Sequence, residues 1–310
     1  MSKKIALVFP GQGSQTVGML NELYQEFSVV RDTFAEASAA LGYDLWQLVA
    51  NGPEESLNET HRTQPALLTA SVAVWRVWQQ QGGATPAFMA GHSLGEYSAL
   101  VCAGVLSLAD AVKLVEKRGQ YMQTAVPAGT GAMSAIIGLD DALIAKACED
   151  AAQGEVVSPV NYNSPGQVVI AGNKAAVERA NELCKAAGAK RALPLPVSVP
   201  SHCALMKPAA EQLTADLAAL SFAPMQIPVV NNVDVAVVDS ADAVKDALIR
   251  QLYSPVRWTE SVEWLVAQGV TDIVELGAGK VLSGLIKRIH KETTTSSVND
   301  LASLQAALSA

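Results

Sequence analysis

Apolar runs of two lengths alternate along the first third of the chain. Short runs at 5–9 and 87–90 have the length of strands, while amphipathic stretches at 65–80 and 108–123 repeat with a helical period, as does a helix expected from about Val17. Strands that alternate with helices are typical of βα units, whose strands run parallel. The pattern predicts an α/β domain with a mainly parallel sheet.

The segment 130–198 has a different rhythm. Its apolar pattern predicts a strand, a helix, two strands joined by a Ser-Pro-Gly turn, a second helix and a last strand, at 131–138, 140–152, 156–163, 167–172, 173–188 and 189–197. This βαββαβ order indicates a ferredoxin-like unit. Strand patterns resume at 228–238 and 271–277. We therefore expect a large α/β domain from 1–129 and 199–310, with 130–198 inserted as a smaller subdomain.

Composition narrows the function classes. The 310 residues are 50% hydrophobic and carry a net charge of −8, which argues against nonspecific nucleic-acid binding. No run of eighteen apolar residues appears and the N-terminal stretch has no small-residue cleavage site, so we expect a cytoplasmic protein without a membrane segment. The four cysteines are far apart, which favours neither a zinc site nor a disulfide framework: Cys102, Cys148, Cys184 and Cys203.

A serine lies between two glycines in the stretch GHSLGEYSAL. Gly91 and Gly95 flank Ser93 in the G-x-S-x-G pattern, after a predicted strand and before a predicted helix. In a strand-to-helix elbow, side chains at the two glycine positions would collide with neighbouring turns. This context favours a nucleophilic serine over an ordinary tight turn.

A serine nucleophile needs a base, and the chain offers four histidines. His92 adjoins the serine and is expected to point away from it, and His290 lies in the basic stretch KRIHKE. His202 follows a predicted strand, where α/β domains place reactive groups, and is favoured as the base over a packing role. No Asp or Glu between 190 and 201 could orient His202, so we expect a main-chain carbonyl or an amide to do so.

An arginine falls on the apolar face of the helix predicted at 108–123. Arg118 lies among Ala111, Leu114, Val115 and Met122. A buried guanidinium needs an anionic partner or several acceptors, which leaves two alternatives: an internal salt bridge, or a clamp for a substrate carboxylate. The Gly-rich loop PGQGSQ could turn its backbone amides towards the serine, and it lacks the third glycine of a dinucleotide site.

These motifs occur in the order of a known family. The chain carries FPGQGSQ, TQPALLTAS, GHSLGEYSAL, EKRGQYMQ, GAMSAIIG, NSPGQVVIAG, PSH, NNVD and ELGAGKVL. Over essentially its whole length it resembles the bacterial malonyl-CoA:acyl carrier protein transacylases, the discrete acyltransferases of type II fatty acid synthesis. The resemblance implies a large α/β-hydrolase-like domain and transfer of malonyl from malonyl-CoA to the phosphopantetheine thiol of acyl carrier protein. It implies a ping-pong reaction through a malonyl-serine, with no cofactor.

The resemblance also implies three principal roles. Ser93 accepts the malonyl group, His202 is its base and later its acid, and Arg118 grips the malonyl carboxylate. Modular synthase domains that select malonyl often have phenylalanine before the histidine, whereas this chain has Ser201. Discrete bacterial enzymes also have serine there, so malonyl stays the favoured group.

Five further positions match the family with supporting roles. The amides of Gln12 and Leu94 resemble the oxyanion hole, and the main-chain carbonyl of Gln251 matches the group that orients the histidine. Gln64 and Met122 match pocket positions.

Two basic pairs stand out on the acidic chain: Lys190 with Arg191, and Lys287 with Arg288. They are candidates for docking the acidic acyl carrier protein, although the sequence alone favours solvated helix ends as their explanation. Two rival functions remain open. One is a serine esterase or lipase, which shares G-x-S-x-G, and the other is a catalytically idle docking subunit that keeps the fold.

Overall fold

A five-stranded parallel sheet, sheet A, forms the centre of the larger part of the molecule in the computed structural model, which describes residues 2–310. Its strand order is β7-β2-β1-β8-β9, with bounds Val229–Val230, Phe88–Gly91, Ile5–Phe9, Asp272–Leu276 and Thr294–Val298. The predicted α/β class with a mainly parallel sheet is confirmed.

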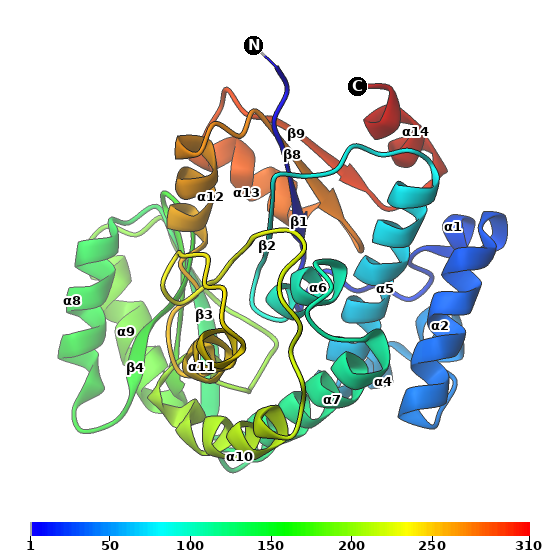
Figure 1. The fold of residues 1–310 in the computed structure, drawn as a ribbon. Coiled ribbons are helices and arrows are strands. Elements are labelled where there is room, and N and C mark those ends of the chain that lie inside the picture. Colours follow the sequence, from blue (N-terminus) through cyan, green and yellow to red (C-terminus); the bar gives the residue numbers. More distant parts are fainter. Residues whose placement is uncertain (1) are drawn as a thin grey trace.

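The central strand β1 is apolar throughout because both of its faces are covered. Leu7 and Phe9 pack into one hydrophobic core, with α5 (Thr60–Gln80), α6 (Gly95–Cys102), α7 (Leu108–Thr124) and α10 (Lys207–Ala218). Ala6 and Val8 point to the opposite face and a second core, with α12 (Trp258–Ala267) and α13 (Val281–Ile289). This alternation follows from the two-residue period of a strand. In Figure 1, α5 lies near the middle and α7 below it, with α12 and α13 at the upper left.

Four short helices precede α5 along the chain. The helix expected from about Val17 begins at Asn21 and is not continuous: α1 is Asn21–Glu26, α2 Ser28–Leu41, α3 Leu45–Asn51 and α4 Glu54–Leu57. Phe27 is extended between α1 and α2, and Gly42 ends α2 at a positive φ of 83°. A left-handed glycine is a common helix terminator. Two further α-helices of the larger part are α11, Ala241–Gln251, and α14, Leu301–Ser309.

The smaller part is built on an antiparallel sheet, sheet B, of order β4-β5-β3-β6. Its strands are β3 Gly131–Ile137, β4 Val157–Ser164, β5 Gln167–Asn173 and β6 Arg191–Pro194, and its helices α8 Asp141–Ala152 and α9 Lys174–Ala186. The βαββαβ order is that of a ferredoxin-like unit. It lies at one edge of the molecule, opposite α1 and α2 (Figure 1).

Two predicted strands are shorter than expected. The strand expected at 189–197 spans only Arg191–Pro194, at the edge of sheet B, and Pro196 beyond it has no N–H to continue the pairing. The strand expected at 228–238 spans only Val229–Val230, since Asn231 and Asn232 begin a turn. Within residues 2–310, no helix is long and apolar enough to cross a membrane.

Candidate active site

The chain turns sharply between β2 and α6, and Ser93 lies at the turn. Its φ of 55° is left-handed, a strained conformation for a serine. A Cβ atom on Gly91 would lie 1.9 Å from the carbonyl carbon of Gly95, and one on Gly95 would lie 2.1 Å from the main-chain oxygen of Phe9. Only glycine fits at either position, so the spacing of the motif has a steric cause.

His202 lies within hydrogen-bond distance of this serine. Its Nε2 is 2.7 Å from Ser93 Oγ, and its Nδ1 is 2.7 Å from the main-chain oxygen of Gln251. A carbonyl oxygen can only accept, so Nδ1 carries the proton and Nε2 accepts the hydrogen bond from the serine hydroxyl. Burial, and then the charge of Arg118, lower the pKa of His202 to about 3. The imidazole is therefore neutral at pH 7, as a general base must be.

His92, the histidine next to the serine, is turned towards the smaller part. Its Nε2 donates to Asn163 Oδ1 of β4 at 2.7 Å. Burial lowers the pKa of His92, so this ring is also neutral. The contact joins the elbow to sheet B and leaves His202 as the histidine bonded to Ser93.

Arg118 is buried on α7, with 1% of its surface exposed, and points at the serine. Its Nη1 donates to Gln64 Oε1 at 2.8 Å, and its Nη2 donates to Gln251 Oε1 at 3.0 Å and lies 3.4 Å from Ser93 Oγ. All three acceptors are neutral. Within residues 2–310 Arg118 forms no ion pair, and its Nε has no hydrogen-bond partner. The internal salt bridge considered from the sequence is therefore absent from the described chain, and an anion could still be bound.

Two backbone amides are candidates for stabilising an oxyanion. Leu94 directly follows the serine and caps α6, while Gln12 lies in the Gly-rich loop after β1. Neither amide nitrogen has a hydrogen-bond partner in the part of the chain that the structure describes. Unpaired amides at a helix N-terminus favour negative charge.

The remaining predicted residues support the arginine. Gln64 is fully buried on α5, where its Oε1 accepts from Arg118 and its Nε2 donates to Met122 Sδ at 3.6 Å. Gln251, at the end of α11, contacts His202 through its main chain and Arg118 through its side chain. The family resemblance implies only the main-chain role of Gln251.

Sequence reasoning missed two buried residues of this cluster. Asn232 Oδ1 accepts from the main-chain nitrogen of Ser93 at 2.8 Å, and Glu96 Oε1 accepts from the main-chain nitrogen of Asn232 at 2.7 Å. A signal was available for Glu96, a carboxylate inside the apolar helix GEYSALVC. Burial raises the pKa of Glu96 to about 7.

The predicted docking residues lie at the surface, away from the buried cluster. Lys190 and Arg191 are exposed at the start of β6, and Lys287 and Arg288 are exposed in the last turn of α13. None of the four forms an ion pair with a residue in the range 2–310.

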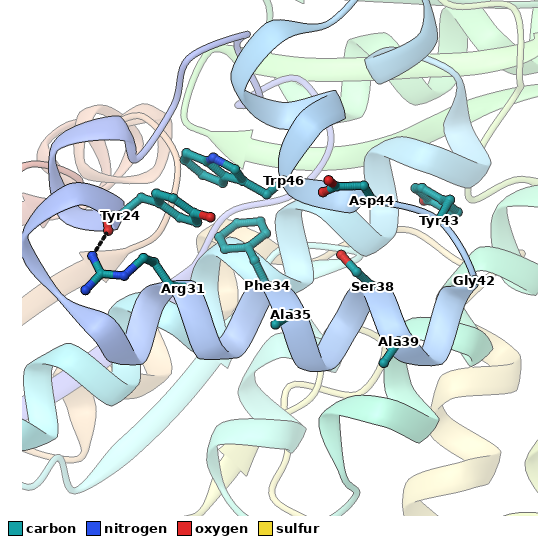
Figure 2. Close-up of a pocket in the computed structure, with 10 residues that line it drawn as sticks. All are labelled: Tyr24, Arg31, Phe34, Ala35, Ser38, Ala39, Gly42, Tyr43, Asp44 and Trp46. Atoms are coloured by element: carbon teal, nitrogen blue, oxygen red, sulfur yellow. Dashed lines mark hydrogen bonds between the residues drawn. The ribbon is translucent and has the colours of Figure 1, made fainter.

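A surface hollow of about 580 Å³ shares no residue with the cluster around Ser93. It runs along α2 and is lined by aromatic side chains, including Tyr24 and Trp46, whose rings stack with centroids 3.7 Å apart (Figure 2). Among residues 2–310 no group of three His, Cys, Asp or Glu side chains could hold a metal ion. The four cysteines are buried free thiols.

The fold and the site together define a class. A serine at a strand-to-helix elbow, bonded to a neutral histidine, is the arrangement of enzymes that form acyl-serine intermediates. The chain belongs to the acyl transferase domain family, whose model matches residues 6–306.

Characterised relatives cover nearly the whole chain. It is 69% identical to the malonyl CoA-acyl carrier protein transacylase of Salmonella typhimurium, over 98% of this chain and 99% of that protein. Among solved structures, an acyl carrier protein S-malonyltransferase from Vibrio cholerae superimposes with a TM-score of 0.97 at 70% identity, covering 98% and 99% of the two chains. A malonyl-transacylase solved in complex with a type II PKS acyl-carrier protein superimposes with a TM-score of 0.98 at 64% identity, with 99% of each chain covered.

Proposed function

We propose that this protein is a malonyl-CoA:acyl carrier protein S-malonyltransferase, which moves malonyl from coenzyme A to the phosphopantetheine thiol of acyl carrier protein. One observation carries the proposal: Ser93 Oγ lies 2.7 Å from His202 Nε2 and 3.4 Å from the buried Arg118, which has no acidic partner among residues 2–310. A nucleophile beside an unpaired cation suits an acyl group that carries its own carboxylate. The names of the relatives support the same substrate and acceptor.

The first half-reaction loads the serine. Ser93 Oγ attacks the thioester carbon while its proton passes to His202 Nε2, and the amides of Gln12 and Leu94 bind the developing oxyanion. When the carbon–sulfur bond breaks, His202 returns the proton to the departing coenzyme A thiolate. Arg118 holds the distal carboxylate through both steps.

The second half-reaction reverses the first with a new thiol. His202 takes the proton of the phosphopantetheine thiol, whose sulfur attacks the malonyl ester, and then gives the proton to Ser93 Oγ. The chemistry balances with protein side chains alone, so we propose that no cofactor takes part. An enzyme of fatty acid synthesis with this substrate would act in the cytoplasm.

The rival hydrolase function is not supported by the group that orients the catalytic histidine. Esterases of this architecture orient the histidine with an acid, whereas His202 Nδ1 donates to a main-chain carbonyl. The clamp at Arg118 also has no purpose for a neutral acyl group. A catalytically idle docking subunit would not require a strained serine that is hydrogen-bonded to a neutral histidine.

Covalent labelling tests the proposal. Intact mass spectrometry after mixing with malonyl-CoA should show one malonyl group on the wild-type chain and none on Ser93→Ala. Transfer of that group to added acyl carrier protein should outpace its loss to water. A malonyl group on Ser93→Ala would refute the assignment of the nucleophile, and rapid loss to water would favour the esterase.

The acyl carrier protein is proposed to dock on the two exposed basic pairs, because an acidic protein attracts an acidic partner through local positive charge. Charges at a rim mainly raise the association rate. Reversing Lys190, Arg191, Lys287 and Arg288 to glutamate should lower kcat/KM for the carrier protein and leave loading from malonyl-CoA intact. Equal loss in both half-reactions would mean that these four residues bind coenzyme A phosphates or are needed for folding.

A further inference from the structure

The side chain of Asn232, which is distant from the nucleophile elbow in sequence, forms hydrogen bonds with the main chain on both sides of the bend. Its Oδ1 accepts from the main-chain nitrogen of Ser93 at 2.8 Å, and its Nδ2 donates to the main-chain oxygen of Gly91 at 2.6 Å. One amide thus bonds the residues on both sides of His92 and closes a ring around the bend. Asn232 is fully buried, so water cannot replace these bonds.

The bend that Asn232 closes is the strained part of the site. Ser93 has a φ of 55°, and a non-glycine residue in this region costs roughly 1–3 kcal/mol and persists only where its surroundings hold it there. Without the two bonds, the elbow has a lower-energy conformation available in which the hydroxyl moves relative to His202. The 2.7 Å contact between Ser93 Oγ and His202 Nε2 depends on that placement.

Glu96 anchors Asn232 in turn. Its Oε1 accepts from the main-chain nitrogen of Asn232 at 2.7 Å and from Gln251 Nε2 at 3.3 Å. Gln251 Nε2 also donates to the main-chain oxygen of Ser93 at 3.0 Å and to Asn232 Oδ1 at 3.2 Å. A single carboxylate oxygen therefore ties the residue that holds the serine to the residue that orients the histidine.

We infer that Asn232 is a positioning residue for the nucleophile, which holds Ser93 in its strained, reactive conformation, and that Glu96 anchors it through a hydrogen-bond acceptor. The inference rests on the proposed role of Ser93. It assigns these two residues to the reactivity of the serine towards any thioester. Selection of the malonyl carboxylate belongs to Arg118.

The neighbouring asparagine provides a matched control. Asn231 is 4% exposed and Asn232 is 0% exposed, so an alanine truncation removes the same buried group at either position. The side chain of Asn231 accepts from the main-chain nitrogen of Asp234 and forms no hydrogen bond with residues 91–95 of the elbow. Any loss that comes from opening a cavity in this loop will appear in both variants.

The experiment measures single-turnover acylation of Ser93 by malonyl-CoA and by acetyl-CoA. Asn232→Ala should lower the maximal acylation rate with both thioesters by about 10²-fold, the cost of a misplacement of about 1 Å. The half-saturating thioester concentration and the malonyl to acetyl ratio should stay at wild-type values. Asn231→Ala should lose much less. A general loss of folded protein would be detected by circular dichroism in both variants. It would not produce a loss of rate that is much larger in Asn232→Ala than in Asn231→Ala.

Two variants at Glu96 test the anchor. Glu96→Gln keeps an acceptor oxygen and should acylate at close to the wild-type rate, whereas Glu96→Met removes it and should lose rate in the same way as Asn232→Ala. Should Asn232→Ala fail to fold, Asn232→Asp serves instead, because it keeps the acceptor for Ser93 and sets an oxygen against the carbonyl of Gly91. It should be slow with both thioesters.

Several results would overturn the inference. They are a wild-type acylation rate in Asn232→Ala or Asn232→Asp, an equal loss in Asn231→Ala, a loss confined to malonyl-CoA, and a Glu96→Gln variant as slow as Glu96→Met. Labelling of Ser93→Ala in the same assay would refute the proposed nucleophile. A labelled Ser93 with a normal rate in Asn232→Ala would refute only the positioning role.

Discussion

Two clusters of buried polar side chains lie at the carboxyl ends of strands in sheet A, and they balance their charge differently. In the first, Glu275 of β8 is 1% exposed and accepts from Ser283 N at 2.9 Å, Ser283 Oγ at 3.0 Å and Leu282 N at 3.3 Å. These donors form the N-terminus of α13, where a carboxylate is stabilised by unpaired amides. This cluster is complete without any other molecule.

The second cluster surrounds Ser93 and is incomplete. Arg118 has neutral acceptors alone, and its Nε and the hydroxyl of Tyr97 have no hydrogen-bond partners among the described residues. Ser93 and His202 both adopt positive φ, at 55° and 62°. Equal burial therefore has two meanings. A charge that donors of the chain bind directly stabilises the fold, whereas a cation that no acid of the described chain contacts directly, beside strained backbone, is available to a substrate.

Removing the base should produce the largest functional effect of any change in this comparison. His202→Ala is expected to lower the rate of Ser93 acylation by about 10² to 10⁴-fold, the range for loss of a general base. The variant removes one neutral ring but leaves a Cβ on the left-handed backbone at position 202, so circular dichroism is used to check that it is folded. Rapid-quench labelling with malonyl-CoA measures the rate. A near-normal rate would assign the base role to His92.

Truncating the arginine should affect selection more than chemistry. Arg118→Ala is expected to cost about 2–5 kcal/mol in kcat/KM for malonyl-CoA, the range for breaking a desolvated charge pair. Acetyl-CoA has no carboxylate, so its relative use should improve. Competition between the two thioesters, read by mass spectrometry, gives the ratio. An unchanged ratio would place Arg118 with Glu275 as a structural residue.

Periodicity and steric rules explain what the sequence could predict. The parallel sheet followed from the alternation of strand and helix patterns, and Arg118 stood out because a cation interrupted an apolar face. Gly91 and Gly95 marked the elbow because a tight bend excludes side chains. The last two of these signals are local, lying within one helix or one turn, and the first follows from the order of neighbouring elements.

The parts that pattern and spacing alone could not predict depend on contacts between distant residues. The carbonyl of Gln251 orients His202 across 49 positions, and because any residue type can supply a main-chain carbonyl, only the family resemblance implied this role. Asn232 contacts Ser93 across 139 positions, from the end of a strand only two residues long. Strand β9 was also not anticipated, because TTSSV at 294–298 is polar and lacks an apolar run.

A substitution in the cluster around Glu275 should lower the stability of the protein and leave its activity unchanged. Glu275→Ala removes the acceptor for three donors at the N-terminus of α13, and leaving buried donors unpaired costs about 1–3 kcal/mol each. Urea unfolding should show a lower free energy of unfolding, while the acylation rate of the folded enzyme stays within a few-fold of wild type. An activity loss without a stability loss would connect Glu275 to the site.

The smallest expected effect is a change in how stability depends on pH. Burial raises the pKa of Glu275 in the folded protein to about 7, from an ordinary value of 4.5, so between these values the folded state binds more protons than the unfolded state. The stability that this protonation contributes is complete below about pH 4.5 and is lost as pH rises through 7. His202 acts in the opposite direction, because its pKa is lowered to about 3, and its contribution is lost as pH falls below 6.5.

Glu275→Gln isolates the first contribution, since the substituted side chain keeps an acceptor oxygen and cannot titrate. Its free energy of unfolding should fall less steeply than that of the wild-type protein between pH 6 and pH 8, by no more than about 1.4 kcal/mol per pH unit, the limit for one proton. Glu96, whose pKa burial also raises to about 7, is present in both proteins and cancels in the difference. Urea titrations at three pH values measure the slopes. Parallel slopes would mean that Glu275 stays ionised throughout this range, with its charge held fully by the amides of α13.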